Sequence, residues 1–352
     1  MRLSVIVPVY NMEAEGKLNY CLDSLAVQTM ADMEVIAVDD ASTDHSLDIM
    51  RSYEKKYPEK FHIVHCEMNR HQGGAKNEGL KYASGEWIGF IDSDDWIVPD
   101  YYERLIRKAE ETGADVVGCD YSLVTEHTMQ VGKLVRNNSA EQTGICGMSQ
   151  RKSLAMRPGS MVLKIYRHEM ITEHQLNFPE NIFYEDNCAG SVWMLYCKRF
   201  EKIEEPLYYY YQHDTSTVHL LSWQRCLDRM QAGELLVAEC AARGFLKTFH
   251  DEIEFRFTEI YYVTTLFSYL GSDTHPRLDR LAQLRDGIKR FFPDFQKNPY
   301  YTGQIGEEEQ KLIRLHMKGN LQLLLYYKAL HFYRKLRNRI KRDSGGNNES
   351  KL

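Results

Sequence analysis

The sequence predicts an α/β protein in which a mostly parallel sheet is flanked by helices and followed by a helical C-terminal region. Short apolar runs alternate with helical patterns over the first 120 of the 352 residues, which is typical of a doubly wound sheet. Helical spacing then continues almost without interruption beyond residue 217. We therefore expect a sheet domain over residues 1–217, a helical region over 218–342 and a disordered tail over 343–352.

The strands are expected where nearly continuous apolar runs occur, because a parallel strand is covered on both faces. In chain order, these runs lie at residues 3–10, 34–40, 61–66, 86–92, 114–122 and 159–167. The pattern weakens between 123 and 160, which indicates loops there.

Helices are expected between these runs. The apolar side chains of Leu18, Cys21, Leu22 and Leu25 recur at helical spacing, and Ser42 or Asp44 is suited to cap the next helix. A Gly-rich turn and a helix follow the third strand. The remaining helices are expected at 100–113 (ending at Gly113), 185–197, 219–244, 250–270, 276–292 and 307–342.

The composition excludes several classes of protein. A formal net charge of −6 argues against a nucleic-acid binder, which needs a broad basic surface. The eight cysteines form no Cys-x-x-Cys pair, and most adjoin apolar residues, so we expect buried reduced thiols rather than disulfides or zinc ligands. The apolar run 3–10 is too short for a signal peptide or a transmembrane span, and the expected location is the cytoplasm.

Carboxylates close two of the expected strands. Asp39 and Asp40 follow the second strand, and Asp92, Asp94 and Asp95 follow the fourth. Ligands of open α/β sheets bind outside the carboxyl ends of the strands, and clustered carboxylates suit Mn²⁺ or Mg²⁺ bridging substrate phosphates. The alternative is that each aspartate caps a helix or turn, which suits Asp95 in particular. A Walker loop and a Gly-x-Gly-x-x-Gly motif are absent, which excludes P-loop and dinucleotide-binding enzymes.

Four segments resemble, in order and spacing, the family 2 inverting glycosyltransferases of the Rossmann-like GT-A fold. They are "SVIVPVYN", "EVIAVDDASTD", "NRHQGGAKNEGLKYASGEWIGFIDSDDW" and "FYEDN", and the resemblance covers roughly residues 1–215. It implies metal-dependent transfer of a sugar from a nucleotide diphosphate, usually UDP, to a hydroxyl of a glycan or lipid-linked acceptor. It also implies surface polysaccharide synthesis, a nucleotide-sugar site within about 1–120 and an acceptor side within about 121–217.

The resemblance further implies roles for individual residues. Asp39 would bond the uracil edge, Asp92 would contact the ribose or the metal, and Asp94 would ligate Mn²⁺ or Mg²⁺. The residues implied in donor binding are Pro8, Val9, Tyr10, Asp39, Lys76, Asp92, Ser93 and His213. Two positions depart from the family pattern, because Lys76 stands where Arg is common and Ala41 where Gly is common. Lysine keeps the charge but loses the bidentate geometry of arginine.

Asp186 matches the position of the family's general base, with Glu185 as the second candidate. Inversion needs a carboxylate that accepts the proton of the attacking hydroxyl. The alternative is that Asp186 caps the helix at 187–197. His213 and Ser216 belong to a polar loop that, in the family, closes over the phosphates, although a histidine on the surface is the alternative for His213.

The segment 328–342 carries seven Lys or Arg residues and no acid. A basic amphipathic helix of this kind either docks on an anionic membrane or packs on the protein with a solvated basic face. Two other functions remain open from the sequence, a sugar-nucleotide nucleotidyltransferase and a non-catalytic scaffold. The first lacks its Gly-rich N-terminal loop here, and the intact aspartates argue against the second.

Overall fold

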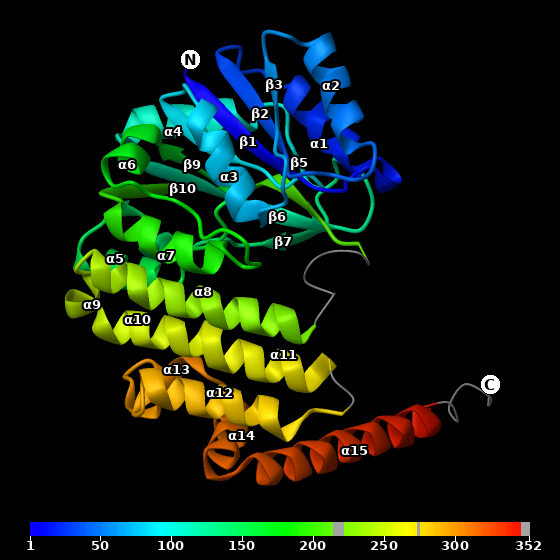
Figure 1. The fold of residues 1–352 in the computed structure, drawn as a ribbon, viewed down its shortest axis with the longest axis vertical. Coiled ribbons are helices and arrows are strands. Elements are labelled where there is room, and N and C mark those ends of the chain that lie inside the picture. The colour runs from blue at the N-terminus through cyan, green and yellow to red at the C-terminus, as the bar shows by residue number, and fades with distance from the viewer. Residues whose placement is uncertain (214–221, 273–274, 346–352) are drawn as a thin grey trace.

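The computed structural model of the chain describes residues 1–213, 222–272 and 275–345. Its centre is a ten-stranded sheet with the order β3-β2-β1-β4-β9-β6-β10-β5, to which β7 adds at β6 and β8 at β10 (Figure 1). The strands are β1 Leu3–Val9, β2 Met33–Asp39, β3 Phe61–His65, β4 Trp87–Phe90, β5 Trp96–Ile97, β6 Val116–Val124, β7 Lys133–Val135, β8 Gly144–Ile145, β9 Lys164–Arg167 and β10 Arg199–Tyr211.

The sheet has a parallel half and a mixed half. Strands β3, β2, β1 and β4 run parallel, and β6 and β10 form a second parallel pair. Between them lies β9, which is antiparallel to both of its neighbours. The strand expected at 159–167 is β9, which covers only Lys164–Arg167. It runs antiparallel to both β4 and β6.

The register of the parallel half brings three strand ends to one edge. Val9 pairs with Asp39 at the ends of β1 and β2, and Ile6 pairs with Phe90 at the end of β4. Residues that follow these strands must therefore lie close together, outside the carboxyl edge.

The helices expected at 100–113 and 185–197 lie close to their expected positions. The expectation of loops between residues 123 and 160 is wrong in part, because two helices and two short strands form there. Helix α4 ends at Gly113, whose φ of 68° is the left-handed value that glycine adopts most readily. The helices are η1 Ala14–Gly16, α1 Lys17–Ala26, α2 Ser46–Lys56, α3 His71–Tyr82, α4 Tyr101–Thr112, η2 Ala140–Gln142, α5 Met148–Met156, α6 His168–Glu173 and α7 Asp186–Tyr196.

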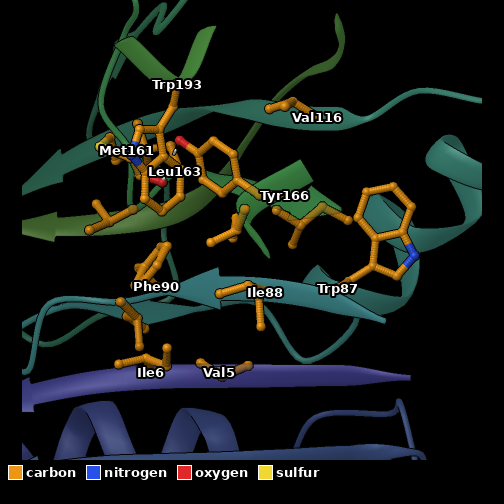
Figure 2. Packing of buried hydrophobic residues seen from close by; sticks show 14 of the residues in the cluster. Val5, Ile6, Trp87, Ile88, Phe90, Val116, Met161, Leu163, Tyr166 and Trp193 are labelled. Atoms are coloured by element: carbon orange, nitrogen blue, oxygen red, sulfur yellow. Dashed lines mark hydrogen bonds between the residues drawn. The ribbon is translucent and has the colours of Figure 1, made fainter. Parts of the chain in front are cut away.

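The core of the domain is formed by side chains of the sheet together with α1, α4 and α7. Figure 2 shows side chains of β1, β4 and β9 that face one another across the strands. The ring of Trp193 on α7 packs against Phe90 and Tyr166, with centroids 6.0 and 5.2 Å away. These contacts fix the start of α7 relative to the end of β4.

The helical region packs onto this domain through α8 and α10 (Figure 1). The first hydrophobic core includes Leu236, Cys240 and Ile253 of these helices, so it extends past the expected boundary at 217. The helices are α8 Trp223–Ala242, α9 Phe245–Thr248, α10 His250–Phe257, a π-helix η3 Thr258–Thr264, α11 Thr265–Ser272, α12 Leu278–Phe291, η4 Phe295–Lys297, α13 Tyr301–Gln304, α14 Glu307–Lys318 and α15 Asn320–Gly345.

The prediction of one helix over 307–342 is wrong. The chain interrupts the helix at Gly319, whose extended backbone (φ 172°, ψ 143°) separates α14 from α15. Helix α15 continues to Gly345, three residues into the segment expected to be a tail, and residues 346–352 lie outside the described part. The expectation of reduced thiols is confirmed, because all eight cysteines are free and buried. Within the described ranges, no helix combines the length and apolarity needed to cross a bilayer.

Candidate active site

The residues that follow β1 and β2 form one side of the site. Pro8 and Val9 are buried in β1, whereas Tyr10 is 45% exposed at the edge. The buried carboxylate of Asp39 already has two partners. Its Oδ2 lies 2.7 Å from His65 Nδ1, and its Oδ1 accepts a hydrogen bond from the Ser42 backbone N–H at 3.2 Å. His65, at the end of β3, is therefore a site residue that the sequence reasoning missed.

Asp40 is less completely satisfied than its neighbour Asp39. Its Oδ1 accepts a hydrogen bond from the Arg70 backbone N–H at 2.9 Å, but its buried Oδ2 has no hydrogen-bond partner. Burial raises the pKa of the Asp40 carboxyl. An unpartnered carboxylate oxygen beside the end of β2 favours a ligand that supplies a donor or a positive charge.

Asp92 lies two residues after β4 and also has a carboxylate oxygen that is not fully satisfied. Its Oδ1 is buried and has no hydrogen-bond partner. Burial raises the pKa of the Asp92 carboxyl to about 7, although the charge of Lys76 opposes the shift. Asp94 and its charge lie beside it and raise this pKa further. Two carboxylates of this kind, one with a free buried oxygen, fit a hard divalent cation.

Asp94 connects to two basic side chains. Its Oδ2 lies 3.0 Å from His213 Nε2, and His213 Nδ1 lies 3.4 Å from the Lys17 Nζ atom. The His213 side chain is only 8% exposed, which argues against the alternative of a solvated surface histidine. Ser93 is buried between the two aspartates. Lys17, which is buried at the start of α1, was not found from the sequence, and Ser216 lies outside the described residues.

Asp95 has a structural role, as the alternative predicted. Its Oδ2 accepts a hydrogen bond from the Tyr208 hydroxyl at 2.6 Å, and its Oδ1 accepts one from the Tyr211 backbone N–H at 2.8 Å. These bonds tie the turn after β4 to β10. Tyr208 Oη also lies 3.4 Å from the backbone N of Asp92, so it supports the whole turn.

A buried ion pair links α3 to the start of α7. The Lys76 Nζ atom lies 2.7 Å from Glu185 Oε1, and both side chains are almost fully buried. Burial alone would lower the pKa of Lys76, but the charges of Glu185 and Asp92 raise it overall. The approach of the two segments needs glycine, because a Cβ at Gly73 would lie 1.9 Å from the Pro179 carbonyl oxygen.

Asp186 is exposed and is the first residue of α7. The alternative that Asp186 is the N-cap of a helix at 187–197 does not hold, because the helix begins at Asp186 and Glu185 occupies the N-cap position. Although solvent reaches Asp186, desolvation by the surrounding protein raises the pKa of its carboxyl, and the charge of Glu185 adds to the effect. A carboxylate with a raised pKa is a better proton acceptor. Tyr184, two residues earlier, has a φ of 67°, a conformation that non-glycine residues rarely adopt.

The chain is similar to several glycosyltransferases. Residues 4–163 match the family model described as Glycosyl transferase family 2. EpsH of Bacillus subtilis (strain 168), whose name describes it as a glycosyltransferase, is 37% identical over 224 residues, which cover 61% of this chain and 62% of EpsH. A poly(ribitol-phosphate) beta-glucosyltransferase of Bacillus spizizenii is 31% identical over 226 residues, which cover 60% of this chain and 32% of that protein. The chain therefore spans less than two thirds of either relative.

One solved structure extends the likeness to nearly the whole chain. The structure of residues 1–349 of S. aureus TarS in complex with UDP-GlcNAc covers 95% of this chain and 92% of that one, with a TM-score of 0.64 and 21% identity. At this level of identity, the likeness concerns the fold. It confirms the expected GT-A architecture followed by a helical region.

Proposed function

Because this chain belongs to glycosyl transferase family 2, we propose that it is a metal-dependent inverting glycosyltransferase. The observation that carries the proposal is the gathering of Asp39, Asp92 and Asp94 at one sheet edge, with Lys76 and Glu185 linking that edge to Asp186. The buried carboxylate oxygens of Asp40 and Asp92 have no partners in the protein, which supports a bound ligand at this edge.

The proposed donor is a nucleotide diphosphate sugar, most simply a UDP-sugar. The TarS structure was solved with UDP-GlcNAc, which supports this class of donor. Tyr10 and Asp39 would hold the base, with Pro8 and Val9 shaping the wall behind it. Lys76, Ser93 and His213 would lie along the ribose and diphosphate, and Lys17 joins them through its contact with His213.

Asp94 and Asp92 would hold Mn²⁺ or Mg²⁺. When bound, the cation neutralises charge on the diphosphate as the sugar leaves. The chain contributes the two carboxylates, and His213 fixes the orientation of one of them through Asp94 Oδ2. The unpartnered Oδ1 of Asp92 supports this assignment.

Asp186 would act as the general base. The acceptor hydroxyl oxygen forms the new bond to the anomeric carbon while the bond from that carbon to the diphosphate oxygen breaks. The hydroxyl proton passes to the Asp186 carboxylate, and the nucleotide diphosphate leaves with the electron pair of the broken bond. Glu185 would act as a positioning residue, because its ion pair with Lys76 holds the segment that carries Asp186.

The proposed acceptor is a hydroxyl of a glycan or lipid-linked glycan in surface polysaccharide synthesis, and nucleic acid is not a partner. The name of one relative, a poly(ribitol-phosphate) beta-glucosyltransferase, supports a polymeric acceptor. We place the enzyme at the cytoplasmic face of the membrane, where free thiols persist.

Helix α15 would make the peripheral contact with an anionic membrane. It extends away from the body (Figure 1) and exposes Leu321, Leu325 and Phe332 along one side. Flotation with anionic and neutral liposomes, with and without residues 328–352, tests this contact. Loss of flotation in the truncated chain is expected, and equal flotation of both chains would contradict it.

Turnover of a panel of UDP-sugars, followed by UDP release, tests the function. A transferase releases UDP and gives a product with inverted anomeric configuration. Release of pyrophosphate from a nucleoside triphosphate and a sugar phosphate would instead identify a nucleotidyltransferase. UDP binding without turnover of any donor–acceptor pair would favour a scaffold.

A further inference from the structure

A recess of about 420 Å³ lies beside the segment that carries Asp186. It is formed where the sheet domain meets the helical region, at the ends of α5 and α7 and along α8 and α10. Its walls are unusually rich in guanidinium groups. The polar residues that line it are Arg157, Tyr184, Asn187, Arg229, Arg256, Glu259 and Thr264.

Arg229, on α8, is the most deeply buried of these residues, with only 8% of its surface exposed. Its Nη1 donates a hydrogen bond to Ser268 Oγ at 3.2 Å, and its guanidinium lies over the ring of Tyr184 at 4.3 Å. Within the described ranges, no carboxylate lies within 4.0 Å of it. A buried cation without a counter-ion is costly unless an anion binds there.

Arg256 and Arg157 add positive charge that is only partly compensated. Arg256 Nη1 lies 2.7 Å from Glu259 Oε2, and Arg157 Nη1 lies 2.6 Å from the same oxygen. Arg256 also donates to Asn187 Oδ1 at 3.0 Å, but its buried Nε has no hydrogen-bond partner. Arg157 and Arg256 therefore share the carboxylate of Glu259, and Arg229 has no carboxylate partner among the described residues. The charge of Asp186 also acts on Arg256.

The recess is adjacent to the proposed base. Tyr184 and Asn187, which flank Glu185 and Asp186 in sequence, both line it. Glu185 forms an ion pair with Lys76 on the side of the proposed donor site. Asn187 accepts a hydrogen bond from Arg256 in the recess. Two local distortions also occur here, the positive φ of Tyr184 and the π-helix at Thr258–Thr264 that carries Glu259. Both kinds of distortion are concentrated at functional sites.

We propose that this recess binds an anionic group of the acceptor, close to the hydroxyl that is glycosylated. The inference rests on the proposed transferase function, because it places the acceptor at Asp186. Arginine binds phosphate and carboxylate oxygens through pairs of parallel hydrogen bonds, and three guanidinium groups match either group. A volume of about 420 Å³ exceeds that of one phosphate, so there is room for the adjoining sugar or alditol.

A purely structural network is the competing explanation. In that case each arginine would pair with a carboxylate, as Arg243 does with Glu239 on the same helix α8 at 2.8 Å. Arg229 instead contacts a hydroxyl and an aromatic ring, which hold the guanidinium in place and leave its charge available.

Binding of inorganic phosphate tests the site directly. Phosphate binding is measured by calorimetry with saturating UDP and Mg²⁺ present, so that the donor site is already occupied. A titration with chloride at equal ionic strength serves as the reference. Wild type is expected to bind phosphate, and the Arg229→Gln variant is expected to bind it at least about 10-fold more weakly. Arg290→Gln, which neutralises an exposed side chain on α12, serves as the control and is expected to bind as wild type does.

Acceptor selection gives the second measurement. A neutral oligosaccharide, a uronic acid oligosaccharide and an alditol phosphodiester oligomer are compared as acceptors with one UDP-sugar. Wild type is expected to prefer one anionic acceptor at least about 10-fold in kcat/KM, and the preferred one identifies the group as phosphate or carboxylate. Arg229→Gln is expected to lose the preference through KM.

Each outcome decides between the two ideas. If wild type fails to bind UDP, the transferase function itself is wrong. If UDP binds but phosphate does not, or Arg229→Gln keeps the phosphate affinity and the acceptor preference of wild type, the anion site is wrong. If Arg229→Gln does not fold, Arg157→Gln at the more exposed rim (side chain 43% exposed) is expected to weaken phosphate binding instead.

Discussion

The aspartates at the carboxyl edge of the sheet and the buried His316 of the helical region are all ionisable, but their hydrogen bonding differs. In the helical region, the Tyr262 hydroxyl donates to His316 Nδ1 at 2.7 Å, and His316 Nε2 donates to the Leu281 carbonyl at 3.0 Å. At the sheet edge, Asp40 and Asp92 each keep a buried carboxylate oxygen without a partner.

This difference indicates which buried groups serve stability and which serve a ligand. A satisfied buried network rigidifies the fold, whereas an unpartnered charged group is costly to keep. Among the described Asp, Glu, Lys and Arg side chains, buried atoms without partners occur only on Asp40, Asp92 and Arg256. The first two lie at the proposed donor site and the third at the proposed anion recess.

The largest expected effect is a loss of turnover without a loss of stability. Asp186→Asn removes the proposed proton acceptor, and kcat is expected to fall by about 10²–10⁴-fold. Because the side chain is exposed at the first position of α7, UDP affinity and melting temperature should stay close to wild type. Glu169→Gln, which removes an exposed carboxylate from the first turn of α6, is the matched control and should keep full activity. Full turnover in Asp186→Asn would remove the base assignment.

Substitution of the neighbouring Glu185 should instead lower the stability of the protein. Glu185→Gln removes the ion-pair partner of the buried Lys76, and the free energy of unfolding is expected to fall by about 3 kcal/mol. Only the more distant charges of Asp92 and Asp186 then act on Lys76. The double variant Lys76→Met/Glu185→Leu leaves no buried charge and should recover part of this loss. Urea denaturation measures all three proteins. A Glu185→Gln protein as stable as wild type would show that the ion pair is not needed to hold the segment.

The buried histidine of the helical region predicts a pH dependence of stability. Burial lowers the pKa of His316 to about 4 in the folded protein, below the ordinary value of 6.5. The neutral form is favoured on folding, so stability is present above pH 6.5 and is lost as the pH falls toward 4. At pH 5 the loss is about 2 kcal/mol.

His316→Gln cannot titrate and isolates this contribution. The difference in unfolding free energy between wild type and the variant, measured in urea at pH 7.5 and pH 5, should shrink by about 2 kcal/mol at the lower pH. If this difference does not change with pH, the pKa of His316 is the same in the folded and the unfolded protein, and burial does not lower it.

The smallest expected effect concerns backbone strain at the sheet edge. Ala41 follows Asp40 with a φ of 61°, which explains why glycine is common at this position. Ala41→Gly should therefore raise the free energy of unfolding by up to about 1 kcal/mol. Ala238→Gly, an exposed position inside α8, should lower it by about 1 kcal/mol. Loss of stability in Ala41→Gly would mean that the strain is relieved elsewhere.

The sequence predicted the parallel half of the sheet well, because buried parallel strands and their closing carboxylates have local signals. Asp39, Asp92 and Asp94 could be assigned to one edge from the apolar runs before them. The antiparallel insertion of β9 could not be predicted, because strand direction depends on long-range pairing. The break at Gly319 was missed since the apolar stripe continues across it.

The partners of the predicted residues were harder to infer. His65 and Tyr208 contact the aspartates, and Lys17 contacts His213, only through the folding of distant segments. The recess around Arg229 had no sequence signal, because its arginines come from different helices and are spread from residue 157 to 256. Such sites follow from the packing of the helical region on the sheet domain.

Binding of UDP with and without Mn²⁺ tests the central claim most directly. Calorimetry on wild type should give UDP binding at least about 10-fold tighter with Mn²⁺, because Asp92 and Asp94 hold the cation that contacts the diphosphate. Asp94→Asn should lose this dependence, and Asp32→Asn, an exposed carboxylate before β2, should keep it. UDP affinity that is the same with and without Mn²⁺ in wild type would contradict a metal-bridged nucleotide site at this sheet edge.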